Sequence, residues 1–364
     1  MSVHPLLHAY EQLRPALRRF GPAMQAYLEE ALADGGVHVH AVSHRVKSLP
    51  SLAGKLAYPG RTYRQLGDIT DLVGVRVITY FEDGVEAAGR VVERALRIDA
   101  ARSVDKRRHD DPSHFGYQSL HYVCAPPAPF EAELPGVAFE VQIRTILQHA
   151  WAEIEHDLGY KSSEAIPLPV RRRFSRLAGL LEIADHEFVS LRRTMEDYAR
   201  DLRRPTRLDD AAVGLDLESL RLLVGRDPVA ALDARLAQAL GIGLRDGEFS
   251  PEYLLAALRA VGLLRPAEVA EAAAAMAPKL EAVAARYVPF AVEALGFDPT
   301  RMPGVERGYS LLMLVHHRVL QAHTLDLHRA EAARALYQRL DGLTAEAAHR
   351  VAEVFVKTFD DLRP

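Results

Sequence analysis

Residues 139–145 alternate between apolar and polar side chains. As a β-strand, this segment would place Glu140, Gln142 and Arg144 on one face and its apolar side chains on the other. A carboxylate, an amide and a guanidinium in a row along one face could bind a metal ion, a ribose and a phosphate. An edge strand with a solvated polar face would show the same pattern, so the neighbouring motifs must decide between the two interpretations.

A second acidic residue, Asp71, directly precedes residues 72–80, which are rich in valine and isoleucine and predict a strand. Asp71 could hold a divalent ion, because Mg²⁺ needs few protein ligands when phosphates supply the rest, or it could shape a turn. Glu140 would be the second acidic ligand if the two strands are neighbours in one sheet. Arg76 shares a face with Gly74, where the missing side chain leaves room, and would serve either a ligand or a structural ion pair.

Basic residues lie on both sides of the proline-marked turns upstream of this strand: Arg45, Lys47, Lys55, Arg61 and Arg64. Such side chains could clamp a triphosphate through charge-assisted hydrogen bonds, or they could be ordinary surface charges. Ser43 is expected to cap a short helix that carries the first two of them.

Residues 116–121 form a further motif, in which Tyr117, Ser119 and His121 would share one face of a strand predicted over 118–123. The tyrosine could stack on a nucleobase, which is typically worth about 1–3 kcal/mol, or it could belong to the core. The loop before it carries a basic cluster that could close over a polyphosphate or simply be exposed: Lys106, Arg107 and Arg108.

A helix expected downstream of the polar strand carries His149, Glu153 and His156, at a spacing that superficially resembles metal ligands. The order differs from His-Glu-x-x-His, and no cysteine accompanies it, so we expect no zinc site. The pair His316-His317 has no companion aspartate at a telling spacing and is expected to be structural.

The elements that must position these residues are predicted from caps and periodicity. Thr145 is the expected N-cap of a helix over 146–158, and Gln148 completes a capping box, so the polar strand should run almost directly into this helix. Further helices are predicted at 5–33, 85–96 and 167–202, further strands at 37–42 and 98–104, and loops at 105–114 and 126–135.

Composition changes near residue 205, where Pro205 and Asp209-Asp210 predict a domain boundary. Residues 1–204 predict an α/β domain, a mixed sheet flanked by helices. Residues 205–364 are rich in alanine and leucine and predict an all-helical domain. Its clearest helices are expected over 251–261, 266–287 and 328–340.

The chain of 364 residues, 49% of them hydrophobic, suits two globular domains. Its single cysteine, Cys124, excludes an intramolecular disulfide framework and is expected to be a buried, inert thiol. The net charge of −4 gives no general attraction to nucleic acid. We expect no signal peptide and no membrane span, and therefore a cytoplasmic protein.

Taken together, the motifs resemble those of RelA/SpoT-type alarmone synthetases, and are closest to the small, single-function members. The resemblance runs from roughly residue 30 to residue 200 and rests on five motifs in the right order: 45–48, 71–77, 116–121, 140–145 and 151–156. It implies a nucleotidyltransferase-like fold for this domain.

The resemblance further implies transfer of pyrophosphate from ATP to the ribose 3′-hydroxyl of GDP or GTP, with release of AMP. By motif match, Asp71 and Glu140 would be catalytic and would hold Mg²⁺. ATP would be bound by Arg45, Lys47, Lys55, Arg61 and Arg64. The acceptor side would be formed by Tyr117, His121, Gln142 and Arg144, with Lys106 and Arg107 from the preceding loop.

The resemblance leaves alternatives open, because the loop 105–114 matches no particular acceptor and residues 205–364 have no counterpart in the smallest synthetases. Some relatives place pyrophosphate on the 3′ end of tRNA, and others make adenosine alarmones. A catalytically idle nucleotide-sensing module is a third interpretation. The helical domain could mediate formation of a homo-oligomer or bind a protein partner.

Overall fold

The computed structural model describes residues 5–60, 62–105, 119–158, 167–204, 206–298, 302–322 and 326–359. The chain forms two compact units, Met1–Thr194 and Met195–Pro364. The sequence places the boundary at 204/205, whereas the units divide within helix α6 (Leu168–Leu202). Leu202, at the end of this helix, belongs to the apolar core of the second unit, which explains why the division falls earlier.

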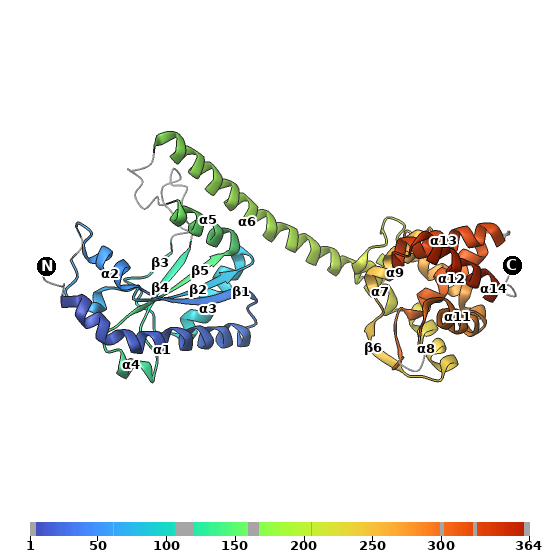
Figure 1. The fold of residues 1–364 in the computed structure, drawn as a ribbon, viewed down its shortest axis with the longest axis horizontal. Coiled ribbons are helices and arrows are strands. Elements are labelled where there is room, and N and C mark those ends of the chain that lie inside the picture. Colours follow the sequence, from blue (N-terminus) through green and yellow to red (C-terminus); the bar gives the residue numbers. More distant parts are fainter. Residues whose placement is uncertain are drawn as a thin grey trace. The chain divides into compact units, whose positions relative to one another are not determined.

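The first unit is built on a five-stranded sheet in the order β1-β2-β5-β4-β3 (Figure 1). The strands are β1 (Val39–Val46), β2 (Val73–Thr79), β3 (Val104–Asp105), β4 (Leu120–Cys124) and β5 (Phe139–Thr145). The central pair β2 and β5 is parallel, and the other pairs are antiparallel. The predicted mixed sheet flanked by helices is therefore confirmed.

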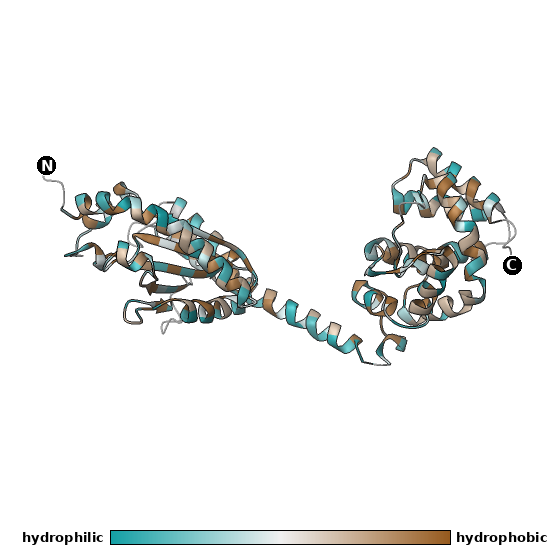
Figure 2. Ribbon diagram, turned by 90° about the horizontal axis from the view of Figure 1, so that it is seen from below, coloured by the Kyte–Doolittle hydropathy of each residue, from teal (hydrophilic) through white to brown (hydrophobic). Residues whose placement is uncertain are grey.

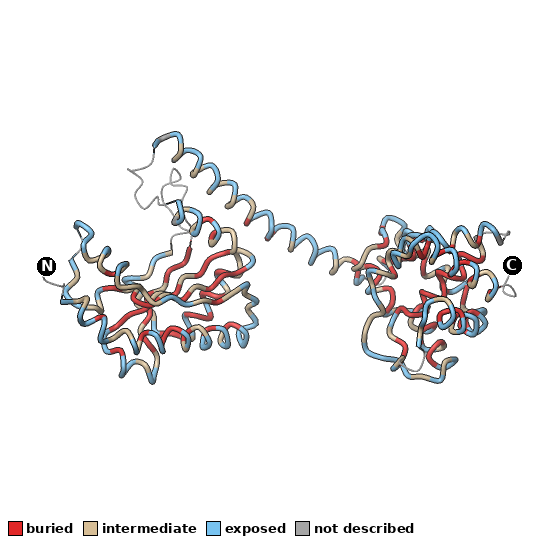
Figure 3. The backbone as a smooth tube through the Cα atoms, viewed as in Figure 1, coloured by how far each residue is buried: buried red, intermediate tan, exposed pale blue. Residues whose placement is uncertain are grey.

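One face of this sheet is apolar and packs against α1 (Pro5–Asp34) and α3 (Glu82–Ala95). The alternation of apolar residues along β2 and β5 supplies Val75 and Val141, which are fully buried. From α1, Phe20 meets Phe139 edge to face, with ring centroids 5.0 Å apart. Figures 2 and 3 show apolar, buried segments on the strands and along the sheet-facing side of α1. This packing leaves the other face of the sheet available for polar side chains.

The polar strand and the helix after it agree with the prediction. Strand β5 ends at Thr145 and α5 (Ile146–Asp157) follows at once. The backbone N–H of Thr145 donates to the side chain of Gln148 at 2.9 Å, and the N–H of Gln148 donates to the Thr145 hydroxyl at 3.1 Å. These are the two hydrogen bonds of a capping box.

Two predicted elements of the first unit are wrong. The short helix expected after Ser43 is absent, because β1 continues to Val46 and pairs with β2, so Arg45 lies on a strand. The strand expected over 98–104 is reduced to a bridge at Ile98 and the short β3, because Asp99 accepts hydrogen bonds from the next backbone N–H groups and closes a turn.

The remaining elements of the first unit are short. They are α2 (Leu49–Leu56), the 3₁₀ turn η1 (Leu66–Asp68) and α4 (Phe130–Glu133), the last of which lies within the expected loop 126–135. Ser48 caps α2, since its hydroxyl accepts a hydrogen bond from the backbone N–H of Ser51 at 3.3 Å. Of the loop expected over 105–114, all but Asp105 lies outside the described residues.

The second unit is helical, as predicted, with two short strands in addition: β6 (Leu244–Glu248) and β7 (Val305–Arg307), which pair in parallel. Its helices are η3 (Arg207–Asp209), α7 (Leu217–Val224), α8 (Val229–Leu240), α9 (Pro251–Ala260), α10 (Pro266–Met276), η4 (Ala277–Lys279), α11 (Leu280–Leu295), α12 (Tyr309–Ala322), α13 (Asp326–Asp341) and α14 (Ala345–Thr358).

The single helix expected over 266–287 is divided into α10, η4 and α11. Pro278 lies at the division, where its ring and missing N–H interrupt the helical hydrogen bonds. Among the helices of the described residues, none has both the length and the apolar character needed to cross a membrane.

Candidate active site

The polar face of the sheet is organised by strand register. Parallel pairing of β2 with β5 puts Gly74 beside Glu140 and Arg76 beside Gln142. On the other side of β2, Arg45 of β1 is the partner of Gly74. Residues that are partners in the register point to the same face of the sheet. Arg45, Gly74 and Glu140 therefore form one row across the sheet, with no side chain at its centre.

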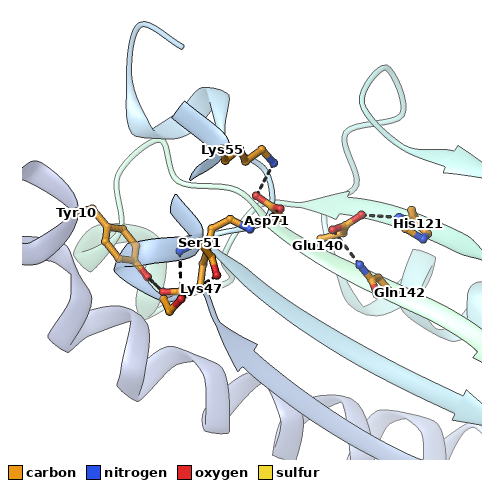
Figure 4. A network of polar contacts seen from close by, with 9 residues as sticks. Tyr10, Lys47, Ser51, Lys55, Asp71, His121, Glu140 and Gln142 are labelled. Atoms are coloured by element: carbon orange, nitrogen blue, oxygen red, sulfur yellow. Dashed lines mark hydrogen bonds and ion pairs between the residues drawn. The ribbon is translucent and has the colours of Figure 1, made fainter. Parts of the chain in front are cut away.

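Asp71 lies at the start of this face and is held by two lysines. Its two carboxylate oxygens accept hydrogen bonds from Lys47 at 2.8 Å and from Lys55 at 2.7 Å (Figure 4). Burial alone raises the pKa of Asp71, but the two lysines outweigh burial and hold the pKa below its ordinary value. Asp71 is therefore ionised at neutral pH, inside a cluster with a net positive charge.

The two lysines reach Asp71 from different elements. Lys47 follows β1, and its backbone carbonyl accepts a hydrogen bond from the hydroxyl of Tyr10 on α1. Lys55 lies in the last turn of α2. The cap of α2 and the anchoring of Lys47 to α1 thus fix both ammonium groups relative to the sheet.

Glu140 is the second carboxylate of the site. Its oxygens accept hydrogen bonds from His121 Nδ1 at 2.5 Å and from the Gln142 amide at 3.1 Å. Burial raises the pKa of Glu140, but the hydrogen bonds from these two residues and the electrostatic interaction with His121 bring it below its usual value. Arg144, which is almost fully buried, donates to Gln142 at 3.1 Å and extends the chain of contacts along β5.

Both carboxylates line one cavity of about 750 Å³. The charge of Asp71 also raises the pKa of Glu140, as expected for two acids that face the same space. The cavity is lined by Arg45, Lys47, Pro50, Ser51, Gly54, Lys55, Tyr58, Asp71, Gly74, Arg76, Glu140 and Gln142. Gly74 leaves it open, since a Cβ at this position would meet no atom within 4 Å.

The structure brings together six residues that the sequence assigns to the site: Arg45, Lys47, Lys55, Asp71, Glu140 and Gln142. Arg144 touches Gln142 but does not line the cavity, and His121 reaches it through Glu140. Arg64 is exposed, and its backbone N–H donates to Asp68 at 2.7 Å, away from the cavity lining. Arg61, Lys106, Arg107 and Tyr117 lie outside the described residues.

Four residues of the lining, all from the segment 50–58, were not assigned to the site from the sequence: Pro50, Ser51, Gly54 and Tyr58. Tyr58 is 61% exposed and follows α2 three residues after Lys55. Ser51 lies in the first turn of the same helix, where its backbone meets the Ser48 cap. The cap before Pro50 was the available signal that this segment folds into a helix and carries these side chains to the lysines.

Among the described residues there is no group of three or more histidine, cysteine or acidic side chains that could hold a metal ion. On α5, Glu153 pairs with Arg76 at 2.9 Å and lies 3.8 Å from His149. Asp71 and Glu140 are the hard oxygen donors of the cavity. They fit an octahedral cation whose remaining ligands come from phosphates and water.

Cys124, His316 and His317 were expected to be structural rather than functional. Cys124 is 1% exposed, and burial raises the pKa of its thiol to about 12, so it is inert as predicted. His316 and His317 are buried in the second unit.

Part of the first unit is similar to known proteins. Its fold and cavity define an α/β domain whose paired acids and lysines suit a phosphorylated ligand. Residues 44–165 match the family described as the region found in RelA / SpoT proteins.

The chain is 28% identical over 160 residues to GTP pyrophosphokinase YjbM of Bacillus subtilis, covering 44% of this chain and 74% of the relative. It is 26% identical over 171 residues to GTP pyrophosphokinase YwaC of the same organism, covering 46% of this chain and 80% of the relative. A crystal structure of small alarmone synthetase 1 from Bacillus subtilis aligns with a TM-score of 0.45 and 24% identity, covering 52% of this chain and 98% of the other.

Proposed function

We propose that this protein transfers pyrophosphate from ATP to the ribose 3′-hydroxyl of GDP or GTP. The observation that carries the proposal is that one cavity is lined by Asp71 with its two lysines, by Gly74 and by Glu140. The two relatives named GTP pyrophosphokinases support the same reaction class. The 3′-oxygen attacks the β-phosphorus of ATP, the bond to the α-phosphate breaks, and AMP leaves.

The donor side is formed by Arg45, Lys47 and Lys55. When the triphosphate enters, the two ammonium groups exchange Asp71 oxygens for phosphate oxygens, which carry more charge. Arg45 lies in the register row of Gly74 and Glu140 and can reach the same phosphates. In phosphoryl transfer the protein mainly positions the substrates and neutralises their negative charge. Positively charged side chains held in place around a cavity are therefore what this reaction requires.

The acceptor side is formed by Glu140 and the residues that hold it. Glu140 accepts the proton of the attacking hydroxyl, and its lowered pKa keeps it ionised at neutral pH. His121 and Gln142 fix the direction of its two oxygens. Arg144 positions Gln142. Tyr117, Lys106 and Arg107 complete the acceptor side in this proposal, and Arg61 the donor side.

Mg²⁺ is the cation that this donor set suits, held by Asp71 and Glu140. When bound, it neutralises charge on the phosphate oxygens and on the leaving AMP. The lysines and arginines of the cavity supply the remaining positive charge from the protein itself.

An acceptor screen tests the proposal. Purified protein, ATP and Mg²⁺ are incubated separately with GDP, GTP, ATP and tRNA, and the products are separated by anion-exchange chromatography. The proposal predicts AMP together with a 3′-pyrophosphorylated guanosine nucleotide. Labelling of tRNA alone, a product from adenosine nucleotides alone, or tight nucleotide binding without AMP release would each contradict it and identify one of the alternatives.

A further inference from the structure

A cavity of about 320 Å³ lies in the second unit, where α9, α12 and α13 pack on one another (Figure 1). It is formed by residues of this unit and shares none of them with the candidate active site. Its volume falls at the small end of the range typical of ligand sites, about 300–1,000 Å³. The cavity is therefore large enough for a small molecule.

The inner part of this cavity is aliphatic. Val319 of α12 and Leu336 of α13 are 5% and 6% exposed, and Val261 at the end of α9 is half-buried. An apolar group that entered here would be removed from water and would contact aliphatic carbon. The rest of the apolar wall consists of alanines, whose short side chains leave the space open: Ala260, Ala332 and Ala335.

The outer part of the cavity carries positive charge. Arg318 and Arg339 line it and are both exposed. Among the described residues, no acidic side chain lines the cavity, and neither guanidinium has an ion-pair or hydrogen-bond partner. Elsewhere in this unit, by contrast, Arg235 pairs with Glu281 at 2.6 Å. The charge at the cavity is thus left for something other than the chain to neutralise.

The positions of the two arginines on their helices bring both charges to this cavity. Of residues 309–320 in α12, Arg318 alone is exposed, so this buried helix reaches solvent at the cavity. On α13, Arg339 follows Ala332 and Leu336 at intervals of seven and three residues. These intervals place all three on one face of a helix, so the guanidinium continues an apolar face.

We propose that this cavity binds a small amphipathic anion, an aliphatic chain that ends in a carboxylate or phosphate group. The chain lies against Val319 and Leu336, and the anionic group accepts hydrogen bonds from Arg318 and Arg339. Guanidinium groups suit such oxyanions, because they offer parallel N–H donors in a fixed plane. The second unit thereby acts as a ligand-binding domain.

The composition of the lining selects this class of ligand over others. Two arginines without an acidic residue disfavour a cation. Aliphatic walls disfavour a wholly polar anion, because its buried oxygens would lack partners. Within the described part of the chain, no aromatic ring lines the cavity on which a nucleobase could stack. The proposal is independent of the proposed reaction, because no residue of the active-site cavity takes part.

Isothermal titration calorimetry of the full chain tests the class of ligand. Octanoate and octyl phosphate are the probes, and the tighter of the two identifies the anionic group. Octanol has a similar chain without the charge, and acetate has the charge without the chain. Both should bind at least about tenfold more weakly than the better probe.

The length of the chain provides an independent measurement. Across butyrate, hexanoate and octanoate, the affinity should rise by roughly fourfold for each added methylene that is buried. Failure of both octanoate and octyl phosphate to bind, equal binding of octanol, or an affinity that does not change with chain length would each overturn the proposal.

Filling the cavity tests the location of the site. Ala332→Leu adds bulk to the wall on α13 and should abolish binding of octanoate, with an unchanged circular dichroism spectrum. Ala335 is exposed, so Ala335→Leu is a second filling variant that does not require the core to rearrange. Octanoate binding that is unaffected in the folded variants would place the ligand elsewhere and overturn the proposal.

Removing the charges tests the role of the arginines. The double variant Arg318→Gln/Arg339→Gln should bind octanoate at least about tenfold more weakly, whereas its affinity for octanol should not change. Arg334→Gln is the matched control, because Arg334 is also exposed on α13 but does not line the cavity. An equal loss of affinity in the control and the double variant would indicate general electrostatics and contradict the proposal.

Discussion

Each of the two acids in the cavity is held by partners that keep it ionised. Asp71 has a lysine on each oxygen, and Glu140 has His121 and Gln142. A half-buried carboxylate without such partners would gain a proton and lose its use as a metal ligand or base. The hydrogen-bond partners therefore set the chemistry of the site as much as the acids themselves.

Glu140→Gln tests the role of this carboxylate. The amide has nearly the same shape, but it neither takes a proton nor binds a cation strongly. We expect the rate of AMP release to fall by roughly 10²–10⁴-fold, with an unchanged circular dichroism spectrum. A variant that keeps more than half of the activity would remove Glu140 from the mechanism.

Lys55→Met tests the donor side. Loss of one charge-assisted hydrogen bond to phosphate should raise the KM for ATP by roughly 10–100-fold, while the KM for the acceptor changes little. Arg94→Met is the control, because Arg94 is exposed at the end of α3 and does not line the cavity. Equal effects of the two substitutions would indicate general electrostatics rather than a phosphate contact.

Glu140 could be predicted from the sequence because alternation fixes which side chains of a strand share a face, and Asp71 because it directly precedes a segment rich in valine and isoleucine. The pairing of Asp71 with Lys47 and Lys55 could not, since the three residues come from different elements. Arg45 was assigned to the site but expected on a helix. It lies on β1 because pairing with β2 outweighed the cap signal of Ser43.

At the scale of elements, the site depends on the parallel pairing of β2 with β5, which brings Gly74 and Glu140 side by side. Strand β2 was predictable from its valine and isoleucine content. The pairing of β2 with β5 was not predictable, because the register between partners 66 residues apart (140 − 74) leaves no local signal in the sequence. The capping box at Thr145 was predictable, because its residues are close in sequence.

Gly74→Leu tests whether the open position between Arg45 and Glu140 is needed. No atom lies within 4 Å of a Cβ here, so the larger side chain would extend into the cavity without disturbing the sheet. We expect nucleotide binding, measured by calorimetry, to be lost while the melting temperature stays the same or rises. Gly74→Ala should retain binding, and equal binding by both variants would show that substrate does not occupy this position.

At the scale of the whole molecule, two units fold around separate cores, and the family match at residues 44–165 lies in the first. The helices of the second unit were predictable from composition and periodicity. Its strands β6 and β7 were not, because they are short and their partners Leu244 and Val305 are 61 residues apart (305 − 244). Pairing between short, distant segments is decided by tertiary structure.

The core of the second unit should make stability depend on pH. His316 is enclosed by aromatic rings, its Nδ1 donates to the carbonyl of Leu312, and its Nε2 accepts from the hydroxyl of Tyr337, both at 2.6 Å. Burial lowers its pKa to about 4, so the folded unit keeps it neutral, while the unfolded chain takes up a proton below pH of about 6.5.

The unfolding free energy should therefore fall by about 2 kcal/mol between pH 7 and pH 5, and level off below pH of about 4. Urea unfolding of the full chain measures this change. His316→Gln should be less stable at pH 7 but should lose this part of the pH dependence. An equal slope in both proteins would place the titrating group elsewhere.

The central claim is that the acids and lysines of one cavity catalyse transfer of an intact pyrophosphoryl group from ATP to a guanosine nucleotide. Phosphorus NMR of a reaction containing ATP, GDP and Mg²⁺, run in parallel with Glu140→Gln protein, tests it most directly. The account predicts equal amounts of AMP and of guanosine nucleotide carrying a 3′-pyrophosphate, absent with the variant. Formation of ADP and phosphate, or of AMP and free pyrophosphate with GDP unchanged, would contradict it.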